Sequence, residues 1–273
     1  MSKGSGMTFI SKNTQSWTIV QISDTHLMDQ EDLKFVQMNP EHSFHGIMRD
    51  IQQRYPELDA IVHTGDLAQV PVPATYARYL AFMHRLNIPF YQIPGNHDEV
   101  EYFPFHQQQN RVHAIHLGRW TIMLLNSAVK NQIDGRIEPS QLAQLDQLLT
   151  EHAGQHVILA CHHHPFAMQS YWVDQHKLKN TADLTEVMAK HQNIKAVLFG
   201  HVHQDSLNIW NNIPFYSTPS TSVQFKPHSD DFALGQEAPG YRVLHLKDNG
   251  EFDTQVHRVE NLVGQINNEI SGY

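Results

Sequence analysis

The sequence contains almost no cysteine, which excludes folds that depend on internal disulfides. Cys161 is the single cysteine, so no internal disulfide can form and a reducing compartment fits the chain. Apolar runs near the roughly 18 residues that span a bilayer are also missing, and residues 1–6 lack the apolar core of a signal peptide. The sequence therefore predicts a cytoplasmic protein without a membrane partner.

Basic residues are also scarce. Lysine and arginine together number 19 against 28 aspartates and glutamates, which gives a formal net charge of -9. Because no basic block is present to follow a phosphate backbone, a nucleic-acid polymer is not an expected partner. A small anionic ligand is still compatible with this charge, since a bound cation dominates the local field of a site.

The chain also lacks linkers rich in serine, glycine or proline, and it lacks internal repeats. We therefore predict a single domain over residues 1–273, with residues 1–15 as a flexible N-terminal segment. A hydrophobic content of 40% is ample for a buried core.

Apolar strand-like runs alternate with helical patterns up to residue 200. The predicted strands of this part are 17–22, 60–63, 90–93, 121–125, 157–160 and 196–199, and the predicted helices are near 41–55, 74–86, 139–152 and 182–192. Short strands follow at 205–210, 213–216, 241–246 and 252–257. The pattern predicts an α/β fold, a four-layer α/β/β/α sandwich of two facing mixed sheets.

Histidine, in contrast, is abundant, with 21 residues that outnumber the 19 lysines and arginines. Lone histidines in helical or hairpin patterns are expected to pack in the core or lie on the surface, namely His42, His45, His84, His113, His116, His152 and His191. Other histidines, together with aspartates and one asparagine, form five short clusters. Each cluster directly follows a predicted strand: Asp24-Thr25-His26, Gly65-Asp66, Gly95-Asn96-His97-Asp98, His162-His163-His164 and Gly200-His201-Val202-His203. Because α/β sheets gather ligands at the carboxyl ends of their strands, these clusters are expected to converge.

Each cluster, taken alone, could have a purely structural role instead of a role in metal binding. Asp24 and His26 could belong to an ordinary turn, and Asp66 could cap a helix, although its two oxygens also suit a bridge between two ions. Asn96 is an uncommon neutral oxygen ligand, and Asp98 could orient His97 by a hydrogen bond. Within the histidine triplet nothing local decides which member is a ligand. Together the five clusters supply seven ligands and one further histidine, which predicts a two-metal phosphoesterase.

The ordered motifs D-x-H, G-D, G-N-H-D, H and G-H-x-H resemble the calcineurin-like metallophosphoesterase superfamily. Other stretches resemble a narrower group, the bacterial class III cyclic-AMP phosphodiesterases: His162-His163-His164-Pro165, Trp172-Val173-Asp174-Gln175-His176, Thr218-Pro219-Ser220-Thr221, Val223-Gln224-Phe225-Lys226-Pro227 and Ala238-Pro239-Gly240-Tyr241-Arg242. The resemblance implies the metallophosphoesterase fold.

The resemblance also implies roles for single residues. A first metal would be held by Asp24, His26, Asp66 and His203, and a second by Asp66, Asn96, His201 and His162, with His163 as the alternative to His162. The substrate contacts would be His26, Asp66, Asn96, His97, His162 and His203, and the catalytic residues would be His97 and Asp98. The cofactors would be two divalent ions per chain, of iron, manganese or zinc, which mixed nitrogen and oxygen ligands do not distinguish.

The predicted function is hydrolysis of 3′,5′-cyclic AMP to 5′-AMP by a metal-bridging hydroxide, which lowers intracellular cyclic AMP. The partner would be this small cyclic nucleotide, and the oligomeric state is left open. Alternatives are a broader phosphodiesterase or phosphomonoesterase that acts on glycerophosphodiesters or 2′,3′-cyclic nucleotides, and a non-catalytic scaffold, which the presence of Asn96 and His97 disfavours. The long segment 219–240 and Trp172 either line a nucleoside pocket or are structural filler.

Overall fold

A five-stranded sheet forms one of the two inner layers of the fold. In the computed structural model, which describes residues 7–11, 15–106 and 108–262, the strand order of this sheet is β12-β11-β2-β3-β4. Its strands are β2 (Ser16–Ile22), β3 (Ala60–His63), β4 (Phe90–Gln92), β11 (Gly240–Lys247) and β12 (Phe252–Arg258). β2, β3 and β4 are parallel, and β11 is antiparallel to both β2 and β12.

A seven-stranded sheet forms the second inner layer, in the order β1-β5-β6-β7-β8-β10-β9. Its strands are β1 (Met7–Ile10), β5 (His113–Leu117), β6 (Trp120–Leu124), β7 (His156–Ala160), β8 (Ile194–Phe199), β9 (Leu207–Trp210) and β10 (Ile213–Ser217). β6, β7, β8 and β10 are parallel, whereas β5 and β9 are antiparallel to their neighbours β6 and β10. Both sheets are therefore mixed, as the sequence predicts.

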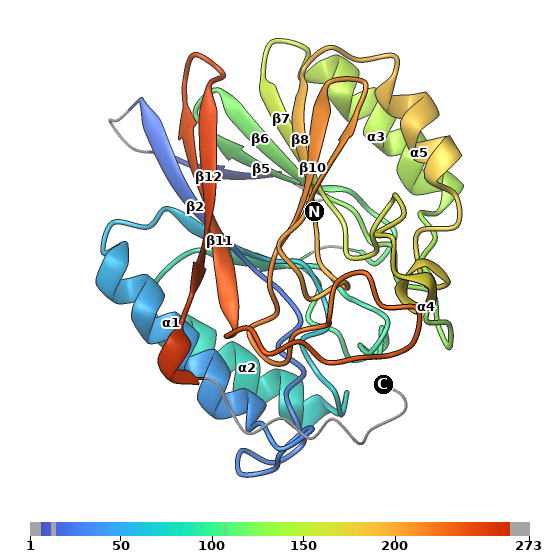
Figure 1. Cartoon of the computed structure of the whole chain (residues 1–273). Coiled ribbons are helices and arrows are strands. Elements are labelled where there is room, and N and C mark those ends of the chain that lie inside the picture. The colour runs from blue at the N-terminus through green and yellow to red at the C-terminus, as the bar shows by residue number, and fades with distance from the viewer. Residues whose placement is uncertain (1–6, 12–14, 107, 263–273) are drawn as a thin grey trace.

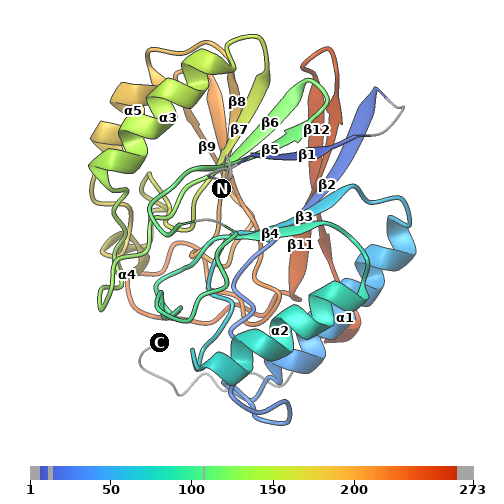
Figure 2. The ribbon, with the colours of Figure 1, turned by 180° about the vertical axis from the view of Figure 1, so that it is seen from behind.

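Helices cover the outer face of each sheet (Figure 1). α1 (Pro40–Arg54) and α2 (Pro73–Arg85) lie on the five-stranded sheet, and α3 (Pro139–Glu151) and α5 (Thr181–Met188) lie on the seven-stranded sheet. The view from behind shows the same four layers (Figure 2). α1, α2 and α3 each begin with proline, whose fixed φ and missing N–H suit the first helical turn. The predicted α/β/β/α sandwich is confirmed.

Three apolar layers hold the four structural layers together. On β2, Trp17 and Ile19 face the other sheet, while Val20 and Ile22 face the helices, because neighbouring strand residues point to opposite faces. The same alternation on β7 and β8 fills the space between the sheets on one side and the space under α3 and α5 on the other. Burial on both faces explains why the central strands read as continuous apolar runs in the sequence.

The segment 1–15, for which the sequence predicts flexibility, contains a short strand. Met7–Ile10 forms β1, which pairs in parallel with β5 and becomes an edge of the seven-stranded sheet. Residues 1–6 and 12–14, which belong to the same expectation, lie outside the described residues. The predicted helix 182–192 ends earlier, at Met188. Among the described helices, none has the length and apolar character that crossing a membrane requires.

Candidate metal centre

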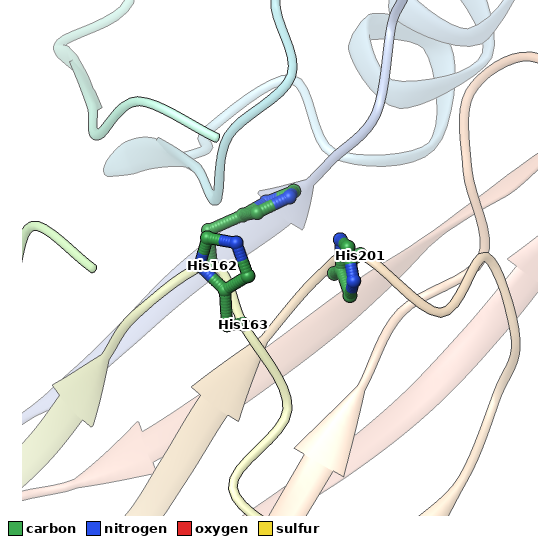
Figure 3. A group of neighbouring side chains, drawn as sticks. All are labelled: His162, His163 and His201. Carbon is green, nitrogen blue, oxygen red and sulfur yellow. The ribbon is translucent and has the colours of Figure 1, made fainter. Parts of the chain in front are cut away.

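The five motif clusters meet at one edge of the sandwich. Asp24 and His26 follow β2, Asp66 follows β3, and Asn96 follows β4, all in the five-stranded sheet. The histidine triplet follows β7 and His201 follows β8 in the other sheet, and Figure 3 shows the rings of His162, His163 and His201 gathered just beyond these strand ends. Parallel strands deliver their carboxyl ends to the same edge, so the two sheets together build one site.

Asp24, His26 and His203 form a first ligand group, with ligand atoms that all lie within 4.8 Å of one another. His26 Nε2 is 3.2 Å from His203 Nε2, and His203 Nε2 is 3.3 Å from Asp24 Oδ1. Two ring nitrogens this close inside the protein suit a shared cation. Burial lowers the pKa of His26 well below its ordinary value, which favours the neutral imidazole that binds metal.

Asp66, Asn96 and His162 form a second group next to the first. His162 Nε2 is 3.2 Å from Asn96 Oδ1 and 3.3 Å from Asp66 Oδ2. The same Asp66 oxygen is 3.8 Å from His26 Nε2, which belongs to the first group. Asp66 thus lies between the two groups, as a bridging carboxylate must.

Hydrogen bonds hold the rings so that Nε2 faces the centre. His26 Nδ1 is 2.8 Å from Gln69 Oε1, and the Nδ1 atoms of His162 and His203 are both 2.7 Å from backbone carbonyls, those of Thr64 and Val223. An Nδ1–H that donates to a carbonyl leaves the Nε2 lone pair for a metal. This donor set fits divalent cations. Gln69 and Thr64 had no signal in the sequence, and Val223 was singled out only as part of a stretch that resembles the cyclic-AMP phosphodiesterases.

His163, the alternative to His162, is held differently. Its Nδ1 is 2.8 Å from Ser127 Oγ and its Nε2 is 3.0 Å from the carbonyl oxygen of Ile133. A ring nitrogen of His163 also lies within 4.8 Å of those of His162 and His201. Since both of its nitrogens are engaged with the protein, this nearness is weaker support than the contacts of His162.

The backbone of the ligand turns is unusual. Five predicted ligands have positive φ angles: Asp24 at 56°, His26 at 50°, Asp66 at 52°, His201 at 68° and His203 at 48°. Residues other than glycine rarely adopt this left-handed conformation, which costs energy and gathers at functional sites. Backbone hydrogen bonds fix these turns, among them Asp24 N to the oxygen of Gly65 (2.9 Å) and His26 N to the oxygen of Asp66 (3.0 Å).

Asp66 and His162 shift each other's pKa in opposite directions. Burial would raise the pKa of the Asp66 carboxyl, but His162 and His97 outweigh it and hold that pKa well below its usual range. Burial would likewise lower the pKa of His162, but Asp66 outweighs it and raises this pKa to about 9. Because metal binds the neutral imidazole, a cation at His162 Nε2 would have to displace the proton that Asp66 favours on this ring.

Asp98 has a different position from the one expected. Its carboxylate accepts hydrogen bonds from four donors, none of them the His97 ring: the backbone amides of Leu67, Ala68 and Gly95 and the hydroxyl of Tyr76, at 3.0 to 3.2 Å. Burial and the nearby Asp66 raise its pKa to about 7. Asp98 thus joins the turn after β3 to the turn after β4 through hydrogen bonds from their backbone amides.

Residues 18–205 match the family model described as calcineurin-like phosphoesterase, which covers more than half of the chain. The chain belongs to this family. The superfamily resemblance read from the motifs is confirmed, and so is the metallophosphoesterase fold.

Curated relatives of this phosphoesterase cover nearly its whole length. It is 36% identical to the 3′,5′-cyclic adenosine monophosphate phosphodiesterase CpdA of Escherichia coli K12, and 34% identical to CpdA of Haemophilus influenzae, in both cases over 93% of this chain and 94% of the relative. It is 33% identical to a 3′,5′-cyclic-nucleotide phosphodiesterase of Nostoc, over 89% of this chain and 92% of that protein. The narrower resemblance is thereby also confirmed.

Solved structures share the fold at low identity. A dimetal phosphatase from Danio rerio aligns over 87% of this chain and 98% of its own, with a TM-score of 0.60 and 15% identity. Purple acid phosphatase PPD1 from yellow lupin aligns over 94% of this chain and 53% of its own, with a TM-score of 0.66 and 13% identity. Both likenesses concern the fold alone.

A cavity of about 250 Å³ opens on the candidate metal centre of the phosphoesterase. Its lining residues are Asp66, Asn96, His97, Ile133, Trp172, Val173, His176, His201, His203, Phe225 and Phe232. His26 and His162, which the sequence predicts as substrate contacts, are not among them. The volume is near the lower end of the roughly 300–1,000 Å³ that small-molecule sites span. Ile133 had no signal in the sequence, whereas Trp172 and the segment 219–240, which contains Phe232, had been singled out.

Proposed function

We propose that this chain hydrolyses 3′,5′-cyclic AMP to 5′-AMP at a centre of two divalent cations. The observation that carries the proposal is the pair of candidate ligand groups with Asp66 between them, next to a small cavity. The names of the curated relatives support the cyclic nucleotide as substrate. We further propose that the reaction takes place in the cytoplasm, which cell fractionation would test.

The ligand assignment follows the two groups. Asp24, His26, Asp66 and His203 would hold one cation, and Asp66, Asn96, His162 and His201 would hold the other. When bound, such ions lower the proton affinity of water and neutralise charge on phosphoryl oxygens. Nitrogen and oxygen donors in this mixture are compatible with iron, manganese or zinc.

His97 is our candidate for the proton donor. Its backbone N–H donates to Asp66 Oδ1 (2.9 Å), and its ring meets that of His26 edge-on at 4.9 Å between centroids. The ring lines the cavity, where it can reach the phosphate and O3′. In the reaction a water loses a proton to solvent and its oxygen bonds to phosphorus, the P–O3′ bond breaks with its electron pair left on O3′, and His97 delivers a proton to O3′.

Electrostatics at His97 bear on this role. Burial lowers the pKa of His97, while Asp66 opposes that shift. A lower pKa makes the imidazolium a stronger acid toward the departing oxygen, although it also reduces the protonated population at neutral pH. Asp98 would support His97 indirectly, through the backbone hydrogen bonds that hold the turn after β4.

Replacement of His97 tests the assignment. His97→Ala should retain two metal ions per chain and lose turnover of cyclic AMP by about 10² to 10⁴-fold, the usual contribution of a positioned acid or base. Elemental analysis and kcat measure the two effects. His84→Ala is the matched control, because His84 is exposed on α2 and does not line the cavity, and it should leave kcat unchanged. An unaltered kcat in His97→Ala would remove this residue from the mechanism.

A broader phosphodiesterase or phosphomonoesterase is the alternative function, because the metal centre alone does not select the substrate. Metal-loaded protein should be assayed against 3′,5′-cyclic AMP, 3′,5′-cyclic GMP, 2′,3′-cyclic AMP and a glycerophosphodiester. We expect the highest kcat/KM with a 3′,5′-cyclic nucleotide. A rate that is equal for all four compounds would favour the broad enzyme.

A further inference from the structure

The cavity beside the candidate metal centre has two chemically different ends. Asp66, Asn96 and His97 line the end that belongs to the metal ligands, whereas Trp172 and Phe232 line the other. Trp172 and Phe232 are each partly buried, so their rings contribute surface to the cavity. An apolar, aromatic end next to a phosphate-binding end is the layout that a nucleotide needs.

The aromatic end is a cluster of three rings. Trp172 meets Phe225 at 4.9 Å and Phe232 at 5.1 Å between centroids, at interplanar angles of 73° and 72°. Both angles are steep, so among the described residues no ring is stacked parallel on Trp172. A flat aromatic ligand can stack on the part of the indole that lines the cavity.

The ring of Phe225 joins this cluster to the candidate metal centre. Phe225 lies flat on His203, with centroids 3.9 Å apart and an angle of 8°. In a 3′,5′-cyclic nucleotide, the same ribose carries both the phosphate and the base. A phosphate at the metal end therefore leaves the base one sugar ring away, at the level of Trp172 and Phe232.

Two anchors fix Trp172 relative to the metal ligands. Trp172 belongs to the short helix α4 (Tyr171–Asp174), and the Asp174 carboxylate accepts a hydrogen bond from the backbone N–H of Met168 at 2.7 Å. The same carboxylate is 3.5 Å from His164 Nε2, and the ring of His164 stacks on that of His201. A surface positioned in this way costs little ordering entropy when a ligand binds.

We propose that Trp172 and Phe232 form a nucleobase subsite, in which the purine of a 3′,5′-cyclic nucleotide stacks on the indole ring. This proposal rests on the proposed function, because that function identifies the metal end of the cavity as the end that binds the phosphate. His176 lines the same cavity, and in this proposal it supplies the hydrogen-bonding group for the edge of the base.

Binding measurements test the subsite without any turnover. Calorimetry on metal-loaded protein would compare 5′-AMP with ribose 5-phosphate, which lacks the base. We expect wild type to bind 5′-AMP more tightly, and Trp172→Ala to lose roughly 5- to 100-fold of affinity for 5′-AMP, the range of one base stacked on an aromatic ring. The affinity for ribose 5-phosphate should stay constant, and His176→Ala should show a smaller loss confined to 5′-AMP.

Kinetics provide a second readout. Trp172→Ala should raise KM for cyclic AMP with little change in kcat, and Trp172→Phe, which keeps a ring, should lie between it and wild type. The cyclic phosphate of 1,3-propanediol, a six-membered diester without a base, should be hydrolysed equally by all three proteins. Trp210→Ala is the matched control, since Trp210 lies on the edge strand β9 and is not among the residues that line the cavity.

Distinct outcomes separate the two proposals. Wild type that binds 5′-AMP no tighter than ribose 5-phosphate would overturn the subsite, whatever its activity. Equal losses of Trp172→Ala toward ligands with and without the base would also overturn it, because the indole would then support the fold. Wild type that prefers 5′-AMP but does not hydrolyse cyclic AMP would retain the subsite and remove the proposed function.

Discussion

The two ends of the cavity are built from different kinds of structure. At the metal end, the side chains stand on short turns directly after the central strands, and several of these turns adopt positive φ angles. At the aromatic end, Trp172 stands on the short helix α4 and Phe232 on the segment between β10 and β11. The proposed metal ligands therefore stand on turns of the central sheets, and the side chains proposed to contact the base of the substrate stand on peripheral segments.

This difference has a physical reason. A residue other than glycine at positive φ costs on the order of 1–3 kcal/mol, and such strain persists only where the surroundings hold it. Sheets buried on both faces provide that rigidity for Asp24, Asp66 and His203. Stacking on an aromatic ring tolerates small displacements, so it does not need the same support. Substitutions at the metal end should therefore affect metal content and kcat, and those at the aromatic end should affect KM.

Removal of the shared carboxylate should have the largest effect. In the proposed assignment, Asp66→Ala removes the ligand that both cations would share, and it also removes the acceptor for the His97 amide. We expect fewer than two metal ions per chain by elemental analysis and a loss of activity beyond the roughly 10⁴-fold upper end for a single acid or base.

Trp172→Ala is the comparison at the other end of the cavity and should keep its full metal content. Circular dichroism would check that both variants fold. If Asp66→Ala still holds two ions per chain, the bridging role of this residue is wrong.

The sequence predicted most of the fold because the central strands are apolar on both faces. A run such as Val157–Ala160 is apolar at every position, so it can be recognised as a strand before its partner strands are known. The turns that follow such runs carry glycine or polar residues. The edge strand β1 was missed because four residues outside the core carry little pattern, and its pairing with β5, more than a hundred residues away, decides its structure. Helix α4 is too short to show a helical period.

The site was predictable only in part, for a related reason. Asp24, His26 and His203 stand in local motifs, and the structure brings them together. The partners that orient their rings are backbone carbonyls or distant side chains such as Gln69, which no local pattern identifies. Asp98 shows the same limit, because its hydrogen-bond donors come from turns that only the fold places beside it. Phe232 lies in a long segment without periodicity.

The choice within the histidine triplet should give an intermediate effect. His162→Ala removes a ring whose Nε2 faces Asn96 and Asp66, so we expect the loss of one metal ion per chain and a fall in activity of more than about 10²-fold. His163→Ala removes a ring that bonds to Ser127 and Ile133, and it should retain both ions with a loss below about 10²-fold. Elemental analysis decides between them, and the reverse pattern would make His163 the ligand.

The same glycine-to-alanine change at each end gives the finest comparison. A Cβ at Gly95 would lie 2.6 Å from the backbone nitrogen of Asp66 and would overlap its carboxylate, whereas a Cβ at Gly235 would meet Gln224 at an ordinary 3.4 Å. Gly95→Ala should displace the shared ligand and lower kcat/KM by about 10²-fold, since a shift near 1 Å has that cost. Gly235→Ala should leave kcat/KM nearly unchanged, because the added Cβ would meet its neighbours only at ordinary van der Waals distances. Equal effects in the two variants would mean that the metal end is no more rigidly held than the segment behind Phe232.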